Sequence, residues 1–227
     1  MSVYDLQGRP YRPELPSALP LFPLREAILL PRGRLPLNIF EPRYLAMTEH
    51  ALAHGRLIGM VRPRHEDDVN PVLYEVGCAG RITSFMETDD GRYLITLSGL
   101  SRFRIETDDL TDEGFRMGRV DWGGFDIDRH PDPEENPALR ESLLEHLMDY
   151  LDEVGLKADW ESIEGASAET LINSVAMACP FAPDEKQAIL EARSLYDRGE
   201  TLIALMQMAI AEQRGDADPD ERASRLQ

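Results

Sequence analysis

Two groups of histidine and acidic residues have the types and spacing that metal chemistry requires. His50 and His54 are four residues apart on an expected helix, a spacing that lets two imidazoles share one metal ion. The residues between them lack the glutamate of an HExxH motif, so an exposed helix face is the favoured interpretation. The run from His65 to Asp68 offers oxygen ligands to a divalent cation, although an acidic loop between two prolines is usually only solvated. Both groups support an alternative hypothesis, an enzyme with an unrecognised site.

The motifs of nucleotide hydrolysis and of serine-lysine peptidases are missing from the sequence. A phosphate-binding loop requires GxxxxGK[ST], and neither of the two lysines, Lys157 and Lys186, follows such a run. A peptidase lysine would have to lie beside a serine held on a loop, yet both lysines lie in helical, acidic surroundings. We therefore expect no ATP hydrolysis, no peptide cleavage, no catalytic residue, no metal and no cofactor.

Charge and cysteine content narrow the partners and the compartment. The formal net charge of −18 repels phosphate backbones, and the arginines are scattered singly, so RNA binding is disfavoured and no nucleic-acid partner is expected. Cys78 and Cys179 form no CxxC pair, which fits a reducing cytoplasm better than disulfides or zinc. The sequence shows neither a signal peptide nor a run of about 18 to 20 apolar residues. We predict a cytoplasmic location and no membrane contact.

Residues 19–128 carry the patterns of β-strands, after a proline-rich polar stretch, 1–18, that we expect to be a flexible arm. Prolines interrupt the apolar runs at 19–24 and 28–30, which predicts strands at the edge or rim of a sheet. Residues 35–39 alternate in polarity, as a strand with one buried face does. Further strands are expected at 57–61, 74–87, 92–99, 102–107 and 115–122. Together the predicted strands are numerous enough to curl into a small open barrel.

The second half of the sequence has helical periodicity. An acidic, proline-rich stretch at 129–137 is interpreted as a linker, and 138–214 as a helical bundle. Helices are expected at 137–154, 167–179, 183–196 and 200–213, with Gly199 separating the last two and a polar tail at 215–227. The sequence thus predicts an α+β fold, in which an N-terminal β-rich barrel is followed by a C-terminal helical bundle.

A charged corner at 38–44, NIFEPRY, ends one of these strands and starts a helix at Pro42. With the hairpin GRITSFMETDDGRYLITLSGLSRFRI at 80–105 and the run FAPDEKQ at 181–187, it resembles the Lon N-terminal domain. That domain is the substrate-engaging module at the front of the Lon ATP-dependent protease, and related copies occur in cereblon and as free-standing bacterial proteins. The resemblance covers roughly residues 19–213.

The resemblance implies a PUA-like β subdomain, a helical bundle and a role in binding other proteins. Because the ATPase and peptidase motifs are missing, we predict a non-catalytic module that binds a client protein or unfolded peptide. Such a module could act as an adaptor in protein quality control for a separate protease. Peptide capture could use strand addition to an open barrel edge or the packing of a helix into a groove.

Four corner residues, Phe40, Glu41, Arg43 and Tyr44, are the candidate partner-binding residues. The charged pair could bind polar groups of a peptide while the two rings offer aromatic surface. Alternatively, all four brace the corner by a salt bridge and core packing, which is favoured because charges beside a proline-capped helix commonly serve local order. In that case Phe40 would be buried, and its truncation would cost about 3 to 5 kcal/mol. A groove between barrel and bundle is the default ligand site.

Overall fold

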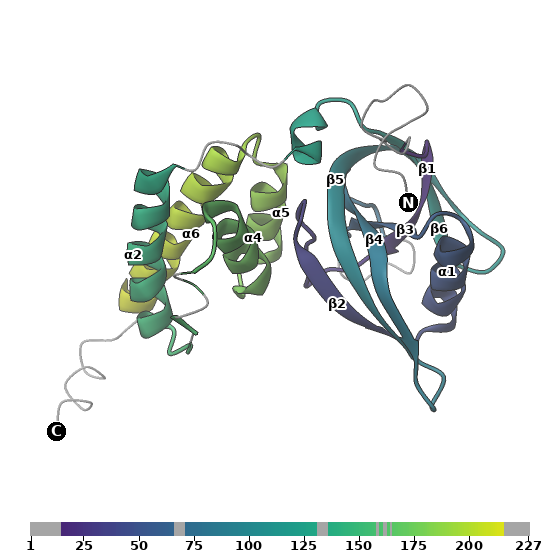
Figure 1. Ribbon diagram of the computed structural model, residues 1–227, viewed down its shortest axis with the longest axis horizontal. Coiled ribbons are helices and arrows are strands. Elements are labelled where there is room, and N and C mark those ends of the chain that lie inside the picture. Colours follow the sequence, from purple (N-terminus) through teal and green to yellow (C-terminus); the bar gives the residue numbers. More distant parts are fainter. Residues whose placement is uncertain are drawn as a thin grey trace.

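The chain folds into a β-rich half and a helical half that lie side by side (Figure 1). The computed structural model describes residues 15–65, 71–130, 136–157, 159–160, 163 and 165–215. Most of the predicted arm, acidic loop, linker and tail lies outside the described residues. The described residues form the α+β fold that the sequence predicts, with strands first and helices second.

In the described part of the chain, six strands form one sheet, and five of them close into a ring. The strands are β1 (Ala18–Pro23), β2 (Arg34–Ile39), β3 (Leu57–Val61), β4 (Val76–Glu87), β5 (Tyr93–Leu110) and β6 (Arg116–Asp121). They follow the order β2-β5-β4-β3-β1-β6, and an additional pairing of β5 with β6 completes the ring. The free edge that we expect of an open barrel therefore falls on β2, which pairs with β5 alone among the described strands.

β5 is a single strand of 18 residues, so the prediction of two strands at 92–99 and 102–107 is wrong. Its first part pairs with β2 and its last part with β6. Against β4 its register shifts at Leu100, which has no directly opposed partner. A Cβ on the preceding Gly99 would clash with the carbonyl oxygen of Leu30. Gly99 therefore does not end the strand but lets the segment before β2 approach it closely.

β1 has neighbours on both sides, so of the two positions predicted from its prolines, an edge or the barrel rim, the edge is wrong. The register with β6 covers Ala18 to Leu21, whereas the parallel register with β3 covers Leu21 to Pro23. The registers with β6 and β3 thus overlap only at Leu21. Pro20 is paired with β6 alone, and Pro23 is paired with β3 alone. A missing proline N–H is tolerated where it would not face a ladder. Residues 28–30, also predicted as a strand, form a buried connection without strand pairing.

The helices begin and end largely where the sequence predicts. They are α1 (Pro42–Ala53), α2 (Pro137–Glu153), α4 (Ala168–Ala178), α5 (Pro183–Glu191) and α6 (Leu195–Gly215), and a short 3-10 turn, η1 (Asp126–Arg129), precedes α2. The side chain of Asn136 accepts from the Leu139 amide at 3.0 Å, and Ser167 caps α4 from the same position. Within the described residues, no helix is sufficiently long and apolar to cross a membrane.

Gly199 lies inside α6, which corrects the prediction that it separates two helices. The break falls earlier, where Ser194 caps the new helix by accepting from the Asp197 amide at 3.0 Å. A Cβ at Gly199 would lie 2.9 Å from Cδ2 of Leu139 on α2. The glycine is therefore explained by the close packing of α2 against α6.

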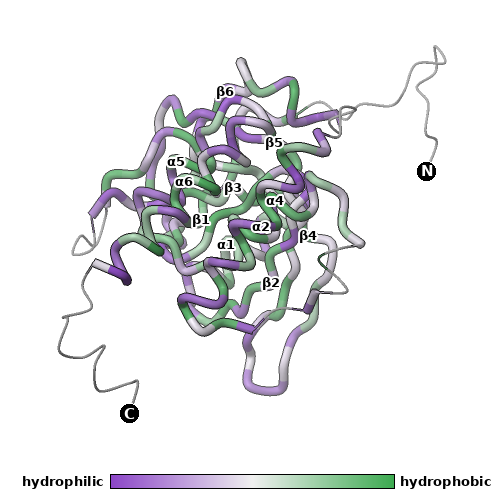
Figure 2. Tube along the Cα trace, turned by 90° about the vertical axis from the view of Figure 1, so that its left-hand side faces the viewer, coloured by the Kyte–Doolittle hydropathy of each residue, from purple (hydrophilic) through white to green (hydrophobic). Residues whose placement is uncertain are grey.

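The described residues form two apolar core clusters, and the larger one crosses from the barrel to the bundle. The smaller cluster includes Leu21, Phe103 and Val120 and draws only on strands and the loops that join them. The larger joins side chains such as Leu30 with Ile172 of α4. Figure 2 shows hydrophobic segments of strands and helices gathered inside and hydrophilic segments at the periphery. Because apolar burial continues across the seam, the two halves support each other's packing.

Candidate functional site

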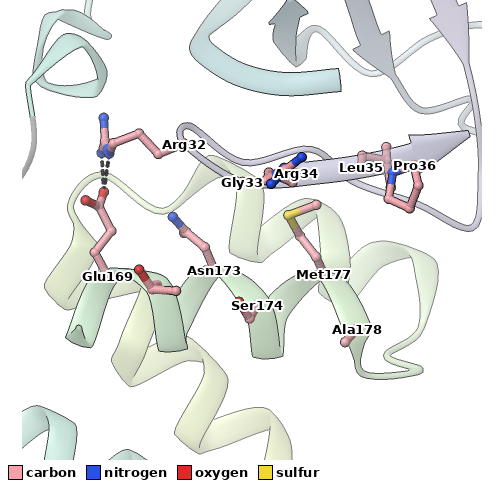
Figure 3. Close-up of a pocket in the computed structure, with 11 residues that line it drawn as sticks. Arg32, Gly33, Arg34, Leu35, Pro36, Glu169, Asn173, Ser174, Met177 and Ala178 are labelled. Atoms are coloured by element: carbon pink, nitrogen blue, oxygen red, sulfur yellow. Dashed lines mark hydrogen bonds and ion pairs between the residues drawn. The ribbon is translucent and has the colours of Figure 1, made fainter. Parts of the chain in front are cut away.

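A groove of about 510 Å³ lies where β2 meets α4. This volume falls in the range typical of ligand sites, roughly 300 to 1,000 Å³. Figure 3 shows Glu169, Asn173 and Met177 of α4 reaching toward the segment that enters β2. The lining comes from two short segments, Arg32, Gly33, Arg34, Leu35 and Pro36 on one side and Glu169, Thr170, Asn173, Ser174, Met177 and Ala178 on the other. The site is thus at the seam between barrel and bundle, where the sequence predicts a default ligand site.

One wall of the groove is fixed by Asn173, a buried polar residue of α4. Its Nδ2 donates to the carbonyl oxygen of Pro31 at 3.0 Å, and its Oδ1 accepts from Arg198 at 3.0 Å. Burial lowers the pKa of Arg198 to about 10, which still leaves the guanidinium charged at neutral pH. The amide therefore ties α4 to the segment before β2 and to α6. Sequence reasoning missed Asn173, although a lone asparagine in the apolar run LINSVAMA is a detectable signal.

The turn that enters β2 is held by Arg32. Its φ of 64° lies in the left-handed region, which is strained for a residue with a side chain. The guanidinium bonds outward on two sides: Nε donates to Glu169 Oε1 at 2.6 Å, and another nitrogen donates to the carbonyl oxygen of Asp128. An unfavourable backbone conformation is retained because these contacts fix the turn against α4 and η1.

A buried ion pair lies behind this turn. Arg102 of β5 and Asp128 of η1 are almost inaccessible, and their side chains form two hydrogen bonds of 2.9 Å. Asp128 also accepts from the Arg102 backbone amide at 2.8 Å, and Arg102 donates to the Leu190 carbonyl at 3.1 Å. Multiple hydrogen bonds of this kind are needed to offset the desolvation of buried charges. The pair therefore locks β5, η1 and α5 into one unit behind the groove.

Further side chains fasten α5 to the barrel. Lys186 is buried rather than solvated, and its Nζ donates to the Glu26 carbonyl at 2.7 Å. Burial lowers the pKa of this lysine. Gln187 donates to the Val76 carbonyl at 3.1 Å. Lys186 thus has a structural explanation, since it holds a backbone carbonyl of the barrel.

The predicted corner residues do not line this groove. Phe40 is 60% exposed, so the expectation that it is a buried bracing residue is wrong. The other three close on one another: Arg43 forms an ion pair of 2.8 Å with Glu41, and its guanidinium lies 4.5 Å from the ring centre of Tyr44. Tyr44 itself is buried against Phe22. Phe40 points outward because it follows the last strand residue, whose side chain takes the buried face.

The histidine pair stacks on itself at the end of α1. The rings of His50 and His54 are 4.2 Å apart and nearly parallel, and His54 Nδ1 lies 2.8 Å from the His50 carbonyl oxygen. Burial, with a smaller contribution from His54, lowers the pKa of His50. Across the described ranges, no three histidine, cysteine or acidic side chains are grouped to hold a metal ion. Of the acidic loop, only His65 is described, and it is exposed.

Solved structures place this fold in a known class. A Lon N-terminal domain protein from Xanthomonas campestris aligns with 82% of this chain and 97% of its own, with a TM-score of 0.57 and 28% identity. The N-terminal domain of a Mycobacterium avium complex Lon protease aligns with 84% of this chain and 98% of its own, with a TM-score of 0.59 and 17% identity. The mixed sheet followed by a helical bundle is therefore the fold of Lon N-terminal domains.

Sequence comparison gives the same family. The family model of the ATP-dependent protease La (LON) substrate-binding domain matches residues 18–208. The chain belongs to this family. It is 30% identical to Lon protease 2 of Sorangium cellulosum over 199 residues, and 26% identical to the Lon protease of Flavobacterium johnsoniae over 204 residues. These alignments cover 84% and 83% of this chain but only 24% of either relative, so the chain spans about a quarter of their length.

Proposed function

We propose that this chain is a non-catalytic substrate-recognition module that binds extended, partly apolar segments of client proteins in the groove between β2 and α4. Such a module would act as an adaptor that presents clients to a separate protease. Family membership supports substrate binding, and the aligned part of the Lon relatives is their substrate-binding domain. The groove at the seam carries the proposal, because it combines apolar lining with the outer edge of β2, to which no described strand pairs.

The edge of β2 favours strand addition over docking of a helix. In the ladder with β5, the Gly99 amide donates to the Gly33 carbonyl at 2.8 Å. Because amides of an antiparallel strand alternate between its two sides, the backbone groups of Arg34, Pro36 and Asn38 face away from β5. These groups can pair with an added strand, as sheet edges do in peptide-binding domains.

Pro36 limits what can be added to this edge. At this position the backbone nitrogen faces the outer side of β2, and proline has no N–H there. An added strand would therefore find one hydrogen-bond donor fewer. Proline on an edge strand is a common protection against uncontrolled sheet association. The module would therefore bind a client segment with one backbone hydrogen bond fewer along this edge and with the help of side-chain contacts in the groove.

Phe40 extends the proposed surface beyond the groove. Its ring is exposed just past the end of β2, with the Arg92 guanidinium 5.9 Å from the ring centre. Exposed aromatic side chains are common contact residues in protein recognition. We assign client contact to Phe40, while Glu41, Arg43 and Tyr44 brace the corner that positions it.

Filling the groove tests the proposal. Ser174 is exposed on α4 and lines the groove, so Ser174→Trp should occupy the client space without disturbing the core. Binding of fluorescein-labelled apolar peptides, measured by anisotropy, should weaken at least about tenfold. Ala204→Trp introduces the same side chain at an exposed position of α6 outside the lining and should bind as the wild type does. Equal affinities of the two variants, with unchanged melting temperatures, would place client binding elsewhere.

The adaptor role needs a separate experiment. Crosslinked pull-downs from the native cell lysate with the wild type should recover client proteins together with a protease. Ser174→Trp should lose the clients and keep the protease, provided that the two contact different surfaces. Recovery of clients without any protease across repeated preparations would argue against the adaptor role and leave the binding function standing.

A further inference from the structure

Arg34 stands out among the charged residues of the groove because its guanidinium is exposed and unpaired. Within the described part of the chain it forms neither an ion pair nor a side-chain hydrogen bond, whereas the neighbouring Arg32 is bonded to Glu169. The lining therefore contains two arginines and one glutamate, and the glutamate is already neutralised by Arg32. Among the described residues, one unpaired positive charge therefore remains beside β2, on a chain whose formal net charge is −18.

The position of Arg34 on the strand fixes where its partner would lie. Its backbone faces the outer edge of β2, so a residue of an added strand would lie directly opposite it. Directly opposed side chains on adjacent strands share a face and have Cβ atoms about 5 Å apart. A carboxylate at that opposed position would reach the guanidinium, and a cation there would be repelled.

The groove beside Arg34 supplies the apolar part of the recognition. Leu35 of β2 and Met177 of α4 line it from opposite sides, and Ala178 adds a small apolar side chain to the α4 side. Methionine is flexible and polarisable, which suits a surface that must fit different apolar side chains. The lining thus fits an apolar side chain next to an acidic one.

We propose that the groove selects client segments in which an internal aspartate or glutamate adjoins a large apolar residue, with Arg34 as the side chain that recognises the carboxylate. This inference rests on the proposed function and names its substrate class. An internal acidic residue is preferred to a chain terminus because the free edge of β2 continues past the groove through Asn38. A client strand would therefore run through the site and not end in it.

Matched peptides test the selectivity. Three labelled peptides with blocked termini would share an extended apolar sequence and differ at one central position, which is Glu, Gln or Lys. The wild type should bind the Glu peptide about two- to fivefold more tightly than the Gln peptide, as expected for a partly exposed cross-strand ion pair. The Lys peptide should bind most weakly. High salt should compress this ranking, since about 1 M salt screens charges beyond roughly 3 Å.

Charge reversal ties the ranking to one residue. Arg34→Glu should invert the order so that the Lys peptide binds best, and Arg34→Gln should bind the Glu and Gln peptides equally. Arg193→Glu changes the net charge by the same amount at an exposed position outside the lining, and it should keep the wild-type order. Freeing the C-terminal carboxylate of the Gln peptide should leave its affinity unchanged.

The outcomes separate this inference from the proposed function. Equal binding of all three peptides to the wild type would overturn the selectivity while leaving client binding intact. A Glu preference that persists in Arg34→Glu, or a gain from the free terminus that matches the gain from Glu, would overturn the assignment to Arg34 and to internal residues. Failure of the wild type to bind any apolar peptide would refute both.

Discussion

The two ends of β2 carry similar residues but use them in opposite ways. At the corner end, Arg43 pairs with Glu41 and covers Tyr44, so its charge is satisfied within the chain. At the groove end, Arg34 has no such partner among the described residues and faces the open space beside α4. The corner is the more recognisable sequence motif, yet its polar groups are engaged internally. A distinctive motif can therefore mark a structural support, while the groove proposed for client binding lies one strand length away.

The largest expected effect comes from removing the support behind the groove end. Asp128→Ala would leave the buried Arg102 without its carboxylate partner, which should cost about 3 to 5 kcal/mol of unfolding free energy in urea denaturation. Asp109→Ala removes an exposed carboxylate and should change stability by less than about 0.5 kcal/mol. A loss for Asp128→Ala no larger than that of the control would show that the ion pair does not hold the seam.

The roles of the two aromatic rings at the corner end can be distinguished by truncating each ring separately. Tyr44→Ala should destabilise the protein by about 3 to 5 kcal/mol because the ring is buried against Phe22. Phe40→Ala should change the unfolding free energy by less than about 1 kcal/mol, because that ring is 60% exposed, but it should weaken client binding. Chemical denaturation and peptide-binding anisotropy of both variants check whether Tyr44 supports the fold while Phe40 contacts the client. Comparable destabilisation by the two variants would contradict it.

The smallest expected effect is a pH dependence from the histidine stack beside the corner. The pKa of His50 is lowered in the folded chain by burial and by His54, so the unfolded chain binds a proton more readily there. Stability should therefore fall as pH drops below the ordinary histidine pKa of about 6.5, until both states are protonated. His50→Gln should flatten this part of a stability profile measured by urea denaturation between about pH 7.5 and 5. An unchanged slope would assign the dependence to other groups.

Local signals account for what the sequence predicts well. Asn136 and Ser167 mark helix starts because a capping side chain acts within three residues of its own position. The corner at Pro42 is likewise a local feature, and the family resemblance covers nearly the whole matched region. These elements suffice to predict the α+β fold and its order.

Signals that depend on distant packing were misinterpreted or missed. Gly99 and Gly199 resemble element boundaries, but each is required by a neighbour from elsewhere in the chain, the Leu30 carbonyl and the Leu139 side chain respectively. The groove has the same origin, since the bond from Asn173 to Pro31 joins residues 142 positions apart. Periodicity and capping carry no information on such pairs, so the sequence predicts a groove between the two halves without its lining.

The pairing of β2 with β5 also has a mechanical consequence. The six register pairs from Arg34 to Ile39 are spaced along the axis of β2, and a client segment added beside β2 would lie along the same axis. Traction along that direction would load all of these pairs at once, in shear, and would not open them one after another. The strand proposed to bind the client would thus resist displacement most firmly along its own axis.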